Sequence, residues 1–241
     1  MRQVMGSNHI VMIVIKKKFI KMNNQEIKYI IGIDEVGRGP LAGPVAVCAF
    51  LIKDENFIES CVTCTSPTGT SAINRTYGKK LPKLKDSKKL SRKQREKWFE
   101  FLKVAKTEGF CDYAVSFVSS ENIDKFGIVK CIQKALDKSL SGLVISCNLE
   151  PRTCNLFLDG GLKASTEYVN QETIIRGDEI HPVISMASIM AKVTRDRIMI
   201  NYAKVYPEYG FEKHVGYGTR AHYSAIKTHG QTPIHRKTFI H

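Results

Sequence analysis

Three short apolar segments, far apart in this chain, each end at acidic residues that stand beside glycine. Runs of this length and composition predict buried β-strands. Their acidic ends can meet only if the three strands are neighbours in one sheet, and this requirement restricts the fold more than any other feature. The segments are 29–33, 155–158 and 173–175, and the acids are Asp34, Glu35, Asp159 and Asp178.

Asp34 and Glu35 are adjacent, so a regular strand would point their side chains to opposite faces. We therefore expect the strand to break at Glu35, and the nearby Gly37 permits such a break. With that break, the four carboxylates converge at one edge of the sheet.

The other patterned segments predict two more strands and four helices. Ser91 and Gln94 form a capping box, Gly127 is a potential helix break, and Thr219 is a potential cap of a last helix that ends near Gly230. Strands interspersed with helices indicate an α/β fold with a mixed five-stranded sheet flanked by helices, beginning as an antiparallel meander. These strands are 44–52 and 113–118, and the helices are 92–106, 120–141, 184–205 and 219–230.

Four carboxylates in one place do not all stay ionised without compensation. Divalent cations with a preference for oxygen ligands, Mg²⁺ or Mn²⁺, are the natural compensation, and phosphate would complete their coordination. Two such ions would clamp the attacking and leaving oxygens of a phosphodiester. The alternative is that each acid is a solvated strand end or a helix cap.

The net charge of +14 and the pI of about 9.5 favour a polyanionic partner, either a nucleic acid or an anionic membrane. The apolar run 10–15 is too short to span a bilayer and does not have the charge order of a signal peptide. We expect a cytoplasmic protein with a basic extension at 1–27, a catalytic domain at 28–241 and an exposed insertion at about 60–82. Within that insertion, the pair Cys61 and Cys64 is interpreted as an ordinary loop, because no second ligand pair accompanies it.

Three further segments have both a structural and a functional interpretation. The glycines at 37, 39 and 43 precede a strand and not a helix, which disfavours a dinucleotide loop and favours contact with a sugar-phosphate backbone. Segment 86–89 is either a helix entry or a phosphate contact. Tyr217, between two glycines, is either a packed turn residue or a ring that stacks on a sugar or base. Asp196 is expected to form a local ion pair.

Several segments occur together in a fixed order over residues 29 to about 239. They are 32–45, 86–90, 159–160, 177–178, 187–197, 216–219 and 233–236. In these segments the chain resembles the ribonuclease HII family. The resemblance implies a ribonuclease H-like fold, a cofactor of Mn²⁺ or Mg²⁺, and hydrolysis that leaves a 3′-hydroxyl and a 5′-phosphate. The implied substrates are RNA–DNA hybrids and duplex DNA nicked on the 5′ side of single embedded ribonucleotides.

The resemblance also implies residue roles. The catalytic, metal-binding acids would be Asp34, Glu35, Asp159 and Asp178. The substrate-binding residues would be Gly37, Arg38 and Gly39 at the 2′-hydroxyl, Ser87 and Lys88 at the backbone, and Tyr217 at the ribonucleotide–DNA junction. Val215 departs from the family, which usually has a basic residue there, so one phosphate contact is either missing or supplied by Lys213 or His214.

Two alternatives remain open. A junction resolvase or an integrase-like nuclease of the same fold would use similar acids without needing a 2′-hydroxyl. A non-catalytic nucleic-acid-binding module would rely on charge alone and tolerate loss of the acids. Nothing in the sequence requires more than a monomer, and no membrane partner is expected.

Overall fold

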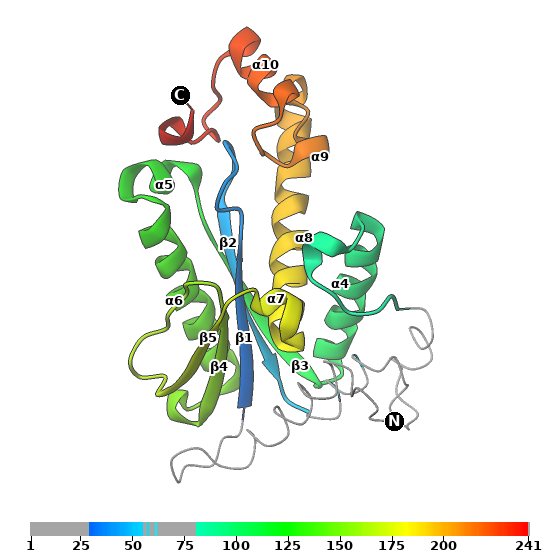
Figure 1. Cartoon of the computed structure of the whole chain (residues 1–241), viewed down its shortest axis with the longest axis vertical. Coiled ribbons are helices and arrows are strands. Elements are labelled where there is room, and N and C mark those ends of the chain that lie inside the picture. Colours follow the sequence, from blue (N-terminus) through cyan, green and yellow to red (C-terminus); the bar gives the residue numbers. More distant parts are fainter. Residues whose placement is uncertain (1–28, 55–56, 58–60, 62–80, 241) are drawn as a thin grey trace, which may run out of the picture.

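A mixed sheet runs through the centre of the computed structural model, which describes residues 29–54, 57, 61 and 81–240. Its strand order is β3-β2-β1-β4-β5 (Figure 1). β1, β2 and β3 form the expected antiparallel meander, whereas β4 and β5 run parallel to β1. The strands are β1 Tyr29–Val36, β2 Val45–Ile52, β3 Cys111–Val118, β4 Cys154–Asp159 and β5 Asn170–Ile174. The predicted α/β class and mixed five-stranded sheet are confirmed.

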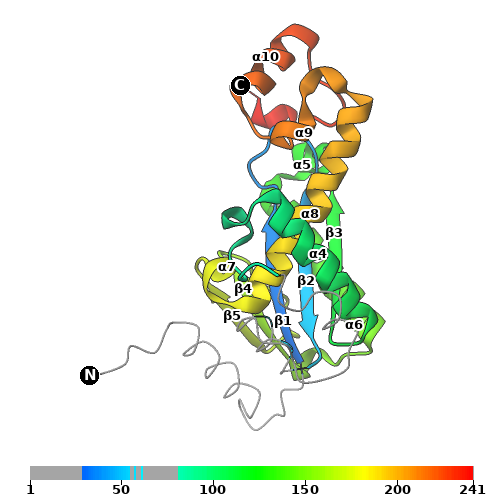
Figure 2. The same cartoon turned by 90° about the vertical axis from the view of Figure 1, so that its right-hand side faces the viewer.

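The helices cover both faces of the sheet (Figures 1 and 2). α8 (Pro182–Val205) and α4 (Arg92–Thr107) pack on one face, and α6 (Ile128–Cys147), which follows α5 (Ser120–Phe126), packs on the other. Strand alternation explains the division, because Ile30 belongs to the core beneath α8 while Ile31 belongs to the core beneath α6. The sheet is therefore the middle layer of three.

Local sequence signals account for several helix boundaries. The capping box of Ser91 and Gln94 begins α4, and Thr219 caps α10 (Arg220–His229). Gly127, with a φ of 80°, separates α5 from α6 at the predicted break. The short helical turns are η2 (Ser87–Lys89), η3 (Pro151–Thr153), α7 (Gly177–Ile180), η4 (Pro207–Tyr209), α9 (Phe211–His214) and η5 (Lys237–Phe239).

Gly32 sets the distance between β1 and α8. A Cβ atom at this position would overlap the backbone carbonyl of Val183, in the first turn of α8. The helix therefore approaches the strand at backbone distance, which brings its polar side chains to the end of β1.

The C-terminal segment returns to the loop between β1 and β2. Met199 of α8, Phe211 and Ile234 form a small separate core with Ala42, and Ala42 also forms a β-bridge with His235. Figure 1 shows α9 and α10 at the far end of α8, beyond the sheet. The inner side of the loop at 37–43 is thus contacted by residues more than 150 positions away in sequence.

The structure also departs from expectation. β5 begins at Asn170, before the predicted 173, because its first residues pair with β4. Cys61, expected in an exposed loop, is buried in the core beneath α8; Cys64, most of the insertion and the extension 1–27 lie outside the described residues. Among the described helices, none has the length and hydropathy needed to cross a bilayer.

Candidate metal centre and substrate-reading loops

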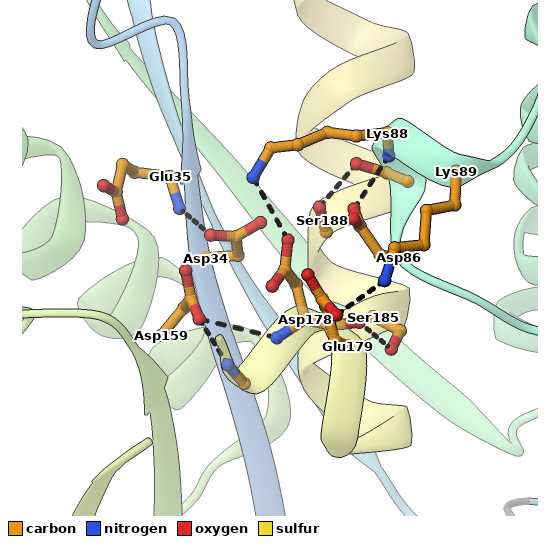
Figure 3. Close-up of polar contacts among 12 residues, drawn as sticks. Asp34, Glu35, Asp86, Lys88, Lys89, Asp159, Asp178, Glu179, Ser185 and Ser188 are labelled. Carbon is orange, nitrogen blue, oxygen red and sulfur yellow. Dashed lines mark hydrogen bonds and ion pairs between the residues drawn. The ribbon is translucent and has the colours of Figure 1, made fainter. Parts of the chain in front are cut away.

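The first two acids stand at the end of β1. Asp34 pairs with Cys48 and Glu35 with Val47, so β1 continues as a regular strand through Val36. The expected break at Glu35 is therefore wrong. Figure 3 shows the two carboxylates on opposite sides of the β1 ribbon, and the Glu35 amide donates to Asp34 Oδ1 at 2.8 Å. The longer glutamate side chain, and not a bend in the strand, lets both acids serve one site.

Asp159 ends β4, beside β1, because the parallel pairing of these strands closes with Ile33 opposite Leu158. Its Oδ1 accepts hydrogen bonds from the amides of Gly177 at 2.6 Å and Asp178 at 3.4 Å. Asp178 lies in α7 and not at a strand end, since β5 stops at Ile174. The Asp159 carboxylate thus fixes the turn that carries the fourth acid.

Three of the four predicted acids form a cluster with metal-ligand spacing. Asp34, Glu35 and Asp159 each offer one oxygen, and these oxygens lie within 4.8 Å of one another. Asp178 lies beside the cluster, with its Oδ2 3.2 Å from Lys88 Nζ. Its charge nevertheless acts on both Asp34 and Asp159.

The cluster has more negative charge than its surroundings stabilise. Burial raises the pKa of Asp34 well above its usual value, and the charges of Glu35, Asp159 and Asp178 raise it further against a hydrogen bond with Ser188. Burial also raises the pKa of Glu35, although the Arg38 cation opposes it, and burial and Asp178 raise the pKa of Asp159.

The residues present fit a divalent cation. Glu35 Oε2 is buried and has no hydrogen-bond partner in the described part of the chain. An unpartnered buried oxygen is costly, and a cation would satisfy it. The donor set consists of carboxylate oxygens, which suits Mg²⁺ or Mn²⁺ better than a softer metal.

The segment around η2 closes the other side of the centre (Figure 3). Ser87, predicted to contact the substrate, is 1% exposed and its Oγ lies 2.7 Å from Ser188 Oγ. Its hydroxyl therefore supports the centre from within. The Lys88 side chain pairs with Asp178 but is 77% exposed, so it remains accessible from the solvent. Asp86 is buried and caps η2 through the Lys88 amide, and burial together with the nearby Asp178 carboxylate raises the pKa of Asp86.

The predicted reading loop follows β1. Gly37, with a φ of 95°, lies against the side chain of Arg195, where a Cβ atom would overlap the guanidinium. Arg38 is exposed and donates to Glu35 Oε1 at 3.2 Å. Gly39 has open space where a side chain would stand. The loop is thus held on its inner side and free on its outer side.

Tyr217 stands on the neighbouring loop. It is 41% exposed, and its ring lies over Lys192 Nζ at 5.5 Å and over the Arg195 guanidinium at 6.0 Å. The exposed part of the ring remains available for contact with a substrate. Lys192 also pairs with Asp196 at 2.9 Å, which confirms the predicted local ion pair.

Val215, the departure from the family pattern, adopts left-handed backbone geometry with a φ of 45°. His214 is committed internally, because its Nε2 donates to the Tyr209 carbonyl at 2.8 Å and its Nδ1 accepts from the Gly216 amide at 3.3 Å. Of the two residues predicted to replace a basic contact here, Lys213 is therefore the better placed.

The sequence patterns predicted no role at the site for Ser188, Arg195 or Arg236, and for Asp86 only the helix entry or phosphate contact of segment 86–89. The available signal was a polar residue inside an otherwise apolar stretch, as for Ser188 within 183–191. That signal does not say what the residue touches, because Ser188, Arg195 and Arg236 each bond a residue more than 90 positions away.

The ends of β1 and β4 form a candidate cation site made only of carboxylate oxygens. Beside it lies a loop that presents glycine backbone and an exposed arginine. This combination defines a metal-dependent nuclease with the ribonuclease H type of sheet.

The comparisons with known proteins identify the family. The family model described as ribonuclease HII matches residues 31–60 and 70–241. Ribonuclease HII of Endomicrobium trichonymphae is 42% identical over 86% of this chain and 83% of its own length. Two solved structures share the fold. The ribonuclease HII in a complex with PCNA from Archaeoglobus fulgidus has a TM-score of 0.60 at 22% identity, covering 86% of this chain and 93% of that one. Bst-RNase HIII in complex with Mn²⁺ has a TM-score of 0.55 at 17% identity, covering 85% and 63%.

The chain belongs to the ribonuclease HII family. It is therefore a metal-dependent endoribonuclease of the ribonuclease H type, a group that acts on RNA–DNA hybrids. The family resemblance found in the sequence motifs is confirmed.

Proposed function

We propose that this endoribonuclease nicks duplex DNA on the 5′ side of a single embedded ribonucleotide, as well as cutting the RNA strand of hybrids, and leaves a 3′-hydroxyl and a 5′-phosphate. The observation that carries the proposal is the cluster of Asp34, Glu35 and Asp159 beside a loop with an open backbone at Gly39. A ribonucleotide differs from its neighbours only by its 2′-hydroxyl, and a backbone without side chains is the surface that approaches such a group closely.

The four acids Asp34, Glu35, Asp159 and Asp178 would hold Mn²⁺ or Mg²⁺. When bound, these cations supply charge neutralisation and polarisation at the scissile phosphate. The Mn²⁺ complex of Bst-RNase HIII, a protein of the same fold, supports this choice of ion. Lys88, exposed beside Asp178, would bind a non-bridging or flanking phosphate oxygen and so orient the strand.

The two loops would divide the recognition of substrate. Gly37, Arg38 and Gly39 would contact the 2′-hydroxyl and the adjoining phosphate, with Ser87 supporting Lys88 from beneath. Tyr217 would stack where the ribonucleotide meets DNA, because its ring is exposed and fixed over two cations. A ring that stacks at one junction matters most for a substrate that offers only one junction.

A pair of matched duplexes tests the nicking activity. One contains a single ribonucleotide and the other is its all-DNA twin. With Mn²⁺ or Mg²⁺ we expect a nick only in the first, and none with the Asp34→Asn variant, which should still bind the duplex. Equal cutting of both duplexes would favour a resolvase, and binding without cutting in either metal would favour a binding module.

The role of Tyr217 is tested by Tyr217→Ala against Tyr217→Phe. The alanine variant should lose activity on the single-ribonucleotide duplex more than on a long hybrid, whereas the phenylalanine variant should stay close to wild type because the ring is kept. Equal losses on both substrates would contradict the stacking role.

The organisation outside the site is also proposed. Residues 28–241 would form the catalytic domain, and the protein would act as a cytoplasmic monomer. The lysines in 1–27 would bind the phosphates of the duplex non-specifically. Deleting 1–27 should then weaken duplex binding and flatten its salt dependence without changing the cleavage position. An unchanged salt dependence would remove the extension from the interface.

A further inference from the structure

Two arginines are completely buried beneath the reading loops. Arg195 of α8 and Arg236, near the C-terminal end, are both 0% exposed. Arg236 donates to the carbonyls of Gly43 at 3.0 Å, Arg38 at 3.0 Å and Gly37 at 2.7 Å. Both guanidinium groups therefore lie on the inner side of the loop between β1 and β2.

Arg195 makes a second set of three such bonds. It donates to the carbonyls of Pro44 at 2.8 Å, Ala42 at 3.2 Å and Val215 at 3.0 Å. The first two belong to the same loop as the carbonyls bound by Arg236, whereas Val215 belongs to the loop of Tyr217. One side chain thus connects the two substrate-reading loops.

Neither cation has an acidic partner among the residues that the structure describes. Within the described ranges, no ion pair involves Arg195 or Arg236, although other arginines form them. Burial lowers the pKa of Arg195, and lowers that of Arg236 to about 9. Arginine is almost never fully buried without a partner, and an apolar side chain would fill the same volume at lower cost. Packing alone therefore does not explain the two guanidinium groups.

The bonds to the carbonyls determine where the loop amides point. In a trans peptide the carbonyl and the following N–H point in opposite directions, and no described peptide bond is cis. Because the carbonyls of Gly37 and Arg38 point inward to Arg236, the amides of Arg38 and Gly39 point outward. Neither amide has a hydrogen-bond acceptor among the described residues. The loop therefore presents two adjacent free donors above two buried positive charges.

This arrangement suits an oxygen ligand with negative charge. Adjacent outward amides form a concave donor site for anions, and uncompensated charge beneath it strengthens the attraction. The open space at Gly39 lets a phosphate or hydroxyl oxygen approach. The Gly216 carbonyl also accepts the amide of Leu41 at 2.8 Å, so the Tyr217 loop is fixed to the same frame.

We propose that Arg195 and Arg236 are positioning residues that hold the 37–44 loop with the Arg38 and Gly39 amides turned outward and lock it to the Tyr217 loop. They would act on substrate affinity and on the preference for a ribonucleotide through the loop, without touching the substrate. The inference rests on the proposed nicking of single ribonucleotides and names what orients its recognition loop.

The kinetic test uses Arg236→Lys and Arg236→Met with Leu143→Ala as a control. Lysine keeps the charge but cannot bond three carbonyls in a plane, methionine removes both, and Leu143 is a buried residue of α6 on the opposite face of the sheet. For the ribonucleotide duplex we expect KM to rise roughly tenfold in Arg236→Met and less in Arg236→Lys, with kcat changed by less than about threefold. Leu143→Ala should lower Tm and leave KM unchanged.

A measurement on the wild-type protein covers the case in which a variant fails to fold. Buried, bonded guanidinium groups should give two slowly exchanging Nε–H signals in ¹⁵N NMR, and each should vanish separately in Arg195→Lys and Arg236→Lys. Fast exchange of both signals would overturn the proposal. So would a KM for Arg236→Met equal to that of wild type, or a KM for Leu143→Ala raised as much as for Arg236→Met.

Cleavage by the wild-type enzyme distinguishes a wrong substrate from a wrong role of the two arginines. If the wild-type enzyme leaves the ribonucleotide duplex uncut, the proposed function is wrong, whatever the arginines do. If it nicks that duplex and the Arg236 variants keep its KM and its preference over the all-DNA twin, only the positioning role is wrong.

Discussion

The Gly37-Arg38-Gly39 segment contains two glycines that the structure uses for opposite purposes. Gly37 has a φ of 95°, and a Cβ atom there would overlap the Arg195 guanidinium and crowd the Pro44 carbonyl at 2.9 Å. Gly39 has no such φ, and nothing stands within 4 Å of the same atom. Replacing each by alanine therefore separates a structural requirement from a functional one.

For Gly37→Ala, two costs add. Left-handed backbone geometry costs a non-glycine residue about 1–2 kcal/mol, and forcing an extra methyl group into a packed site costs about 1–3 kcal/mol. We expect the free energy of unfolding to fall by roughly 2–5 kcal/mol, which corresponds to a Tm decrease of roughly 5–20 °C for a chain of this size. Nicking should fall as well, because Arg195 is displaced from the loop it supports.

For Gly39→Ala, the free energy of unfolding should change by less than about 0.5 kcal/mol, since the methyl group enters open space. The ribonucleotide duplex should nevertheless bind more weakly, because that space is the proposed place of the substrate. Urea unfolding and nicking kinetics on the same preparations measure both effects. Equal destabilisation by the two substitutions, or full activity in Gly39→Ala, would refute the reasoning.

Three further predictions concern charge and packing. Asp34→Asn should raise the Tm of the metal-free protein, because it removes a buried charge whose pKa is raised by burial and by its acidic neighbours, and should abolish the Tm increase on adding Mn²⁺; a thermal-shift titration that shows neither change would contradict the metal site. His222 is buried, and burial lowers its pKa from 6.5 to about 4. The free energy of unfolding should therefore fall by roughly 3 kcal/mol as the pH decreases from about 6.5 to about 4, because the unfolded chain takes up a proton that the folded chain excludes. Unfolding of His222→Gln across that range should therefore show a shallower slope than wild type, and equal slopes would oppose the assignment. Gly32→Ala should lower Tm by at least about 5 °C and weaken Mn²⁺ binding, because the new methyl group forces α8 away from β1, and calorimetry showing wild-type affinity would argue against that coupling.

Much of the site was predictable because it depends on short-range patterns. Apolar runs that end in acids predict strand ends with ligands. The meeting of Asp34 and Asp159 was predictable only on the condition that their strands are neighbours, and the parallel pairing of β1 with β4 fulfils that condition. The order of the motifs identified the family from the sequence alone. The helix caps at Ser91 and Thr219 and the break at Gly127 are equally local, so they too were predicted correctly.

The tertiary structure alone decided how the side chains are used. Strand geometry at Glu35 stayed regular because pairing with β2 continues to Val36, and side-chain length brought the carboxylate into the site instead of a break. Ser87 turned inward because α8, at backbone distance from β1, placed Ser188 within hydrogen-bond reach. Arg236 lies 199 positions from the Gly37 carbonyl it binds. A residue type and its neighbours in sequence do not specify such partners, because burial and hydrogen bonding depend on which distant surfaces the folded sheet brings together.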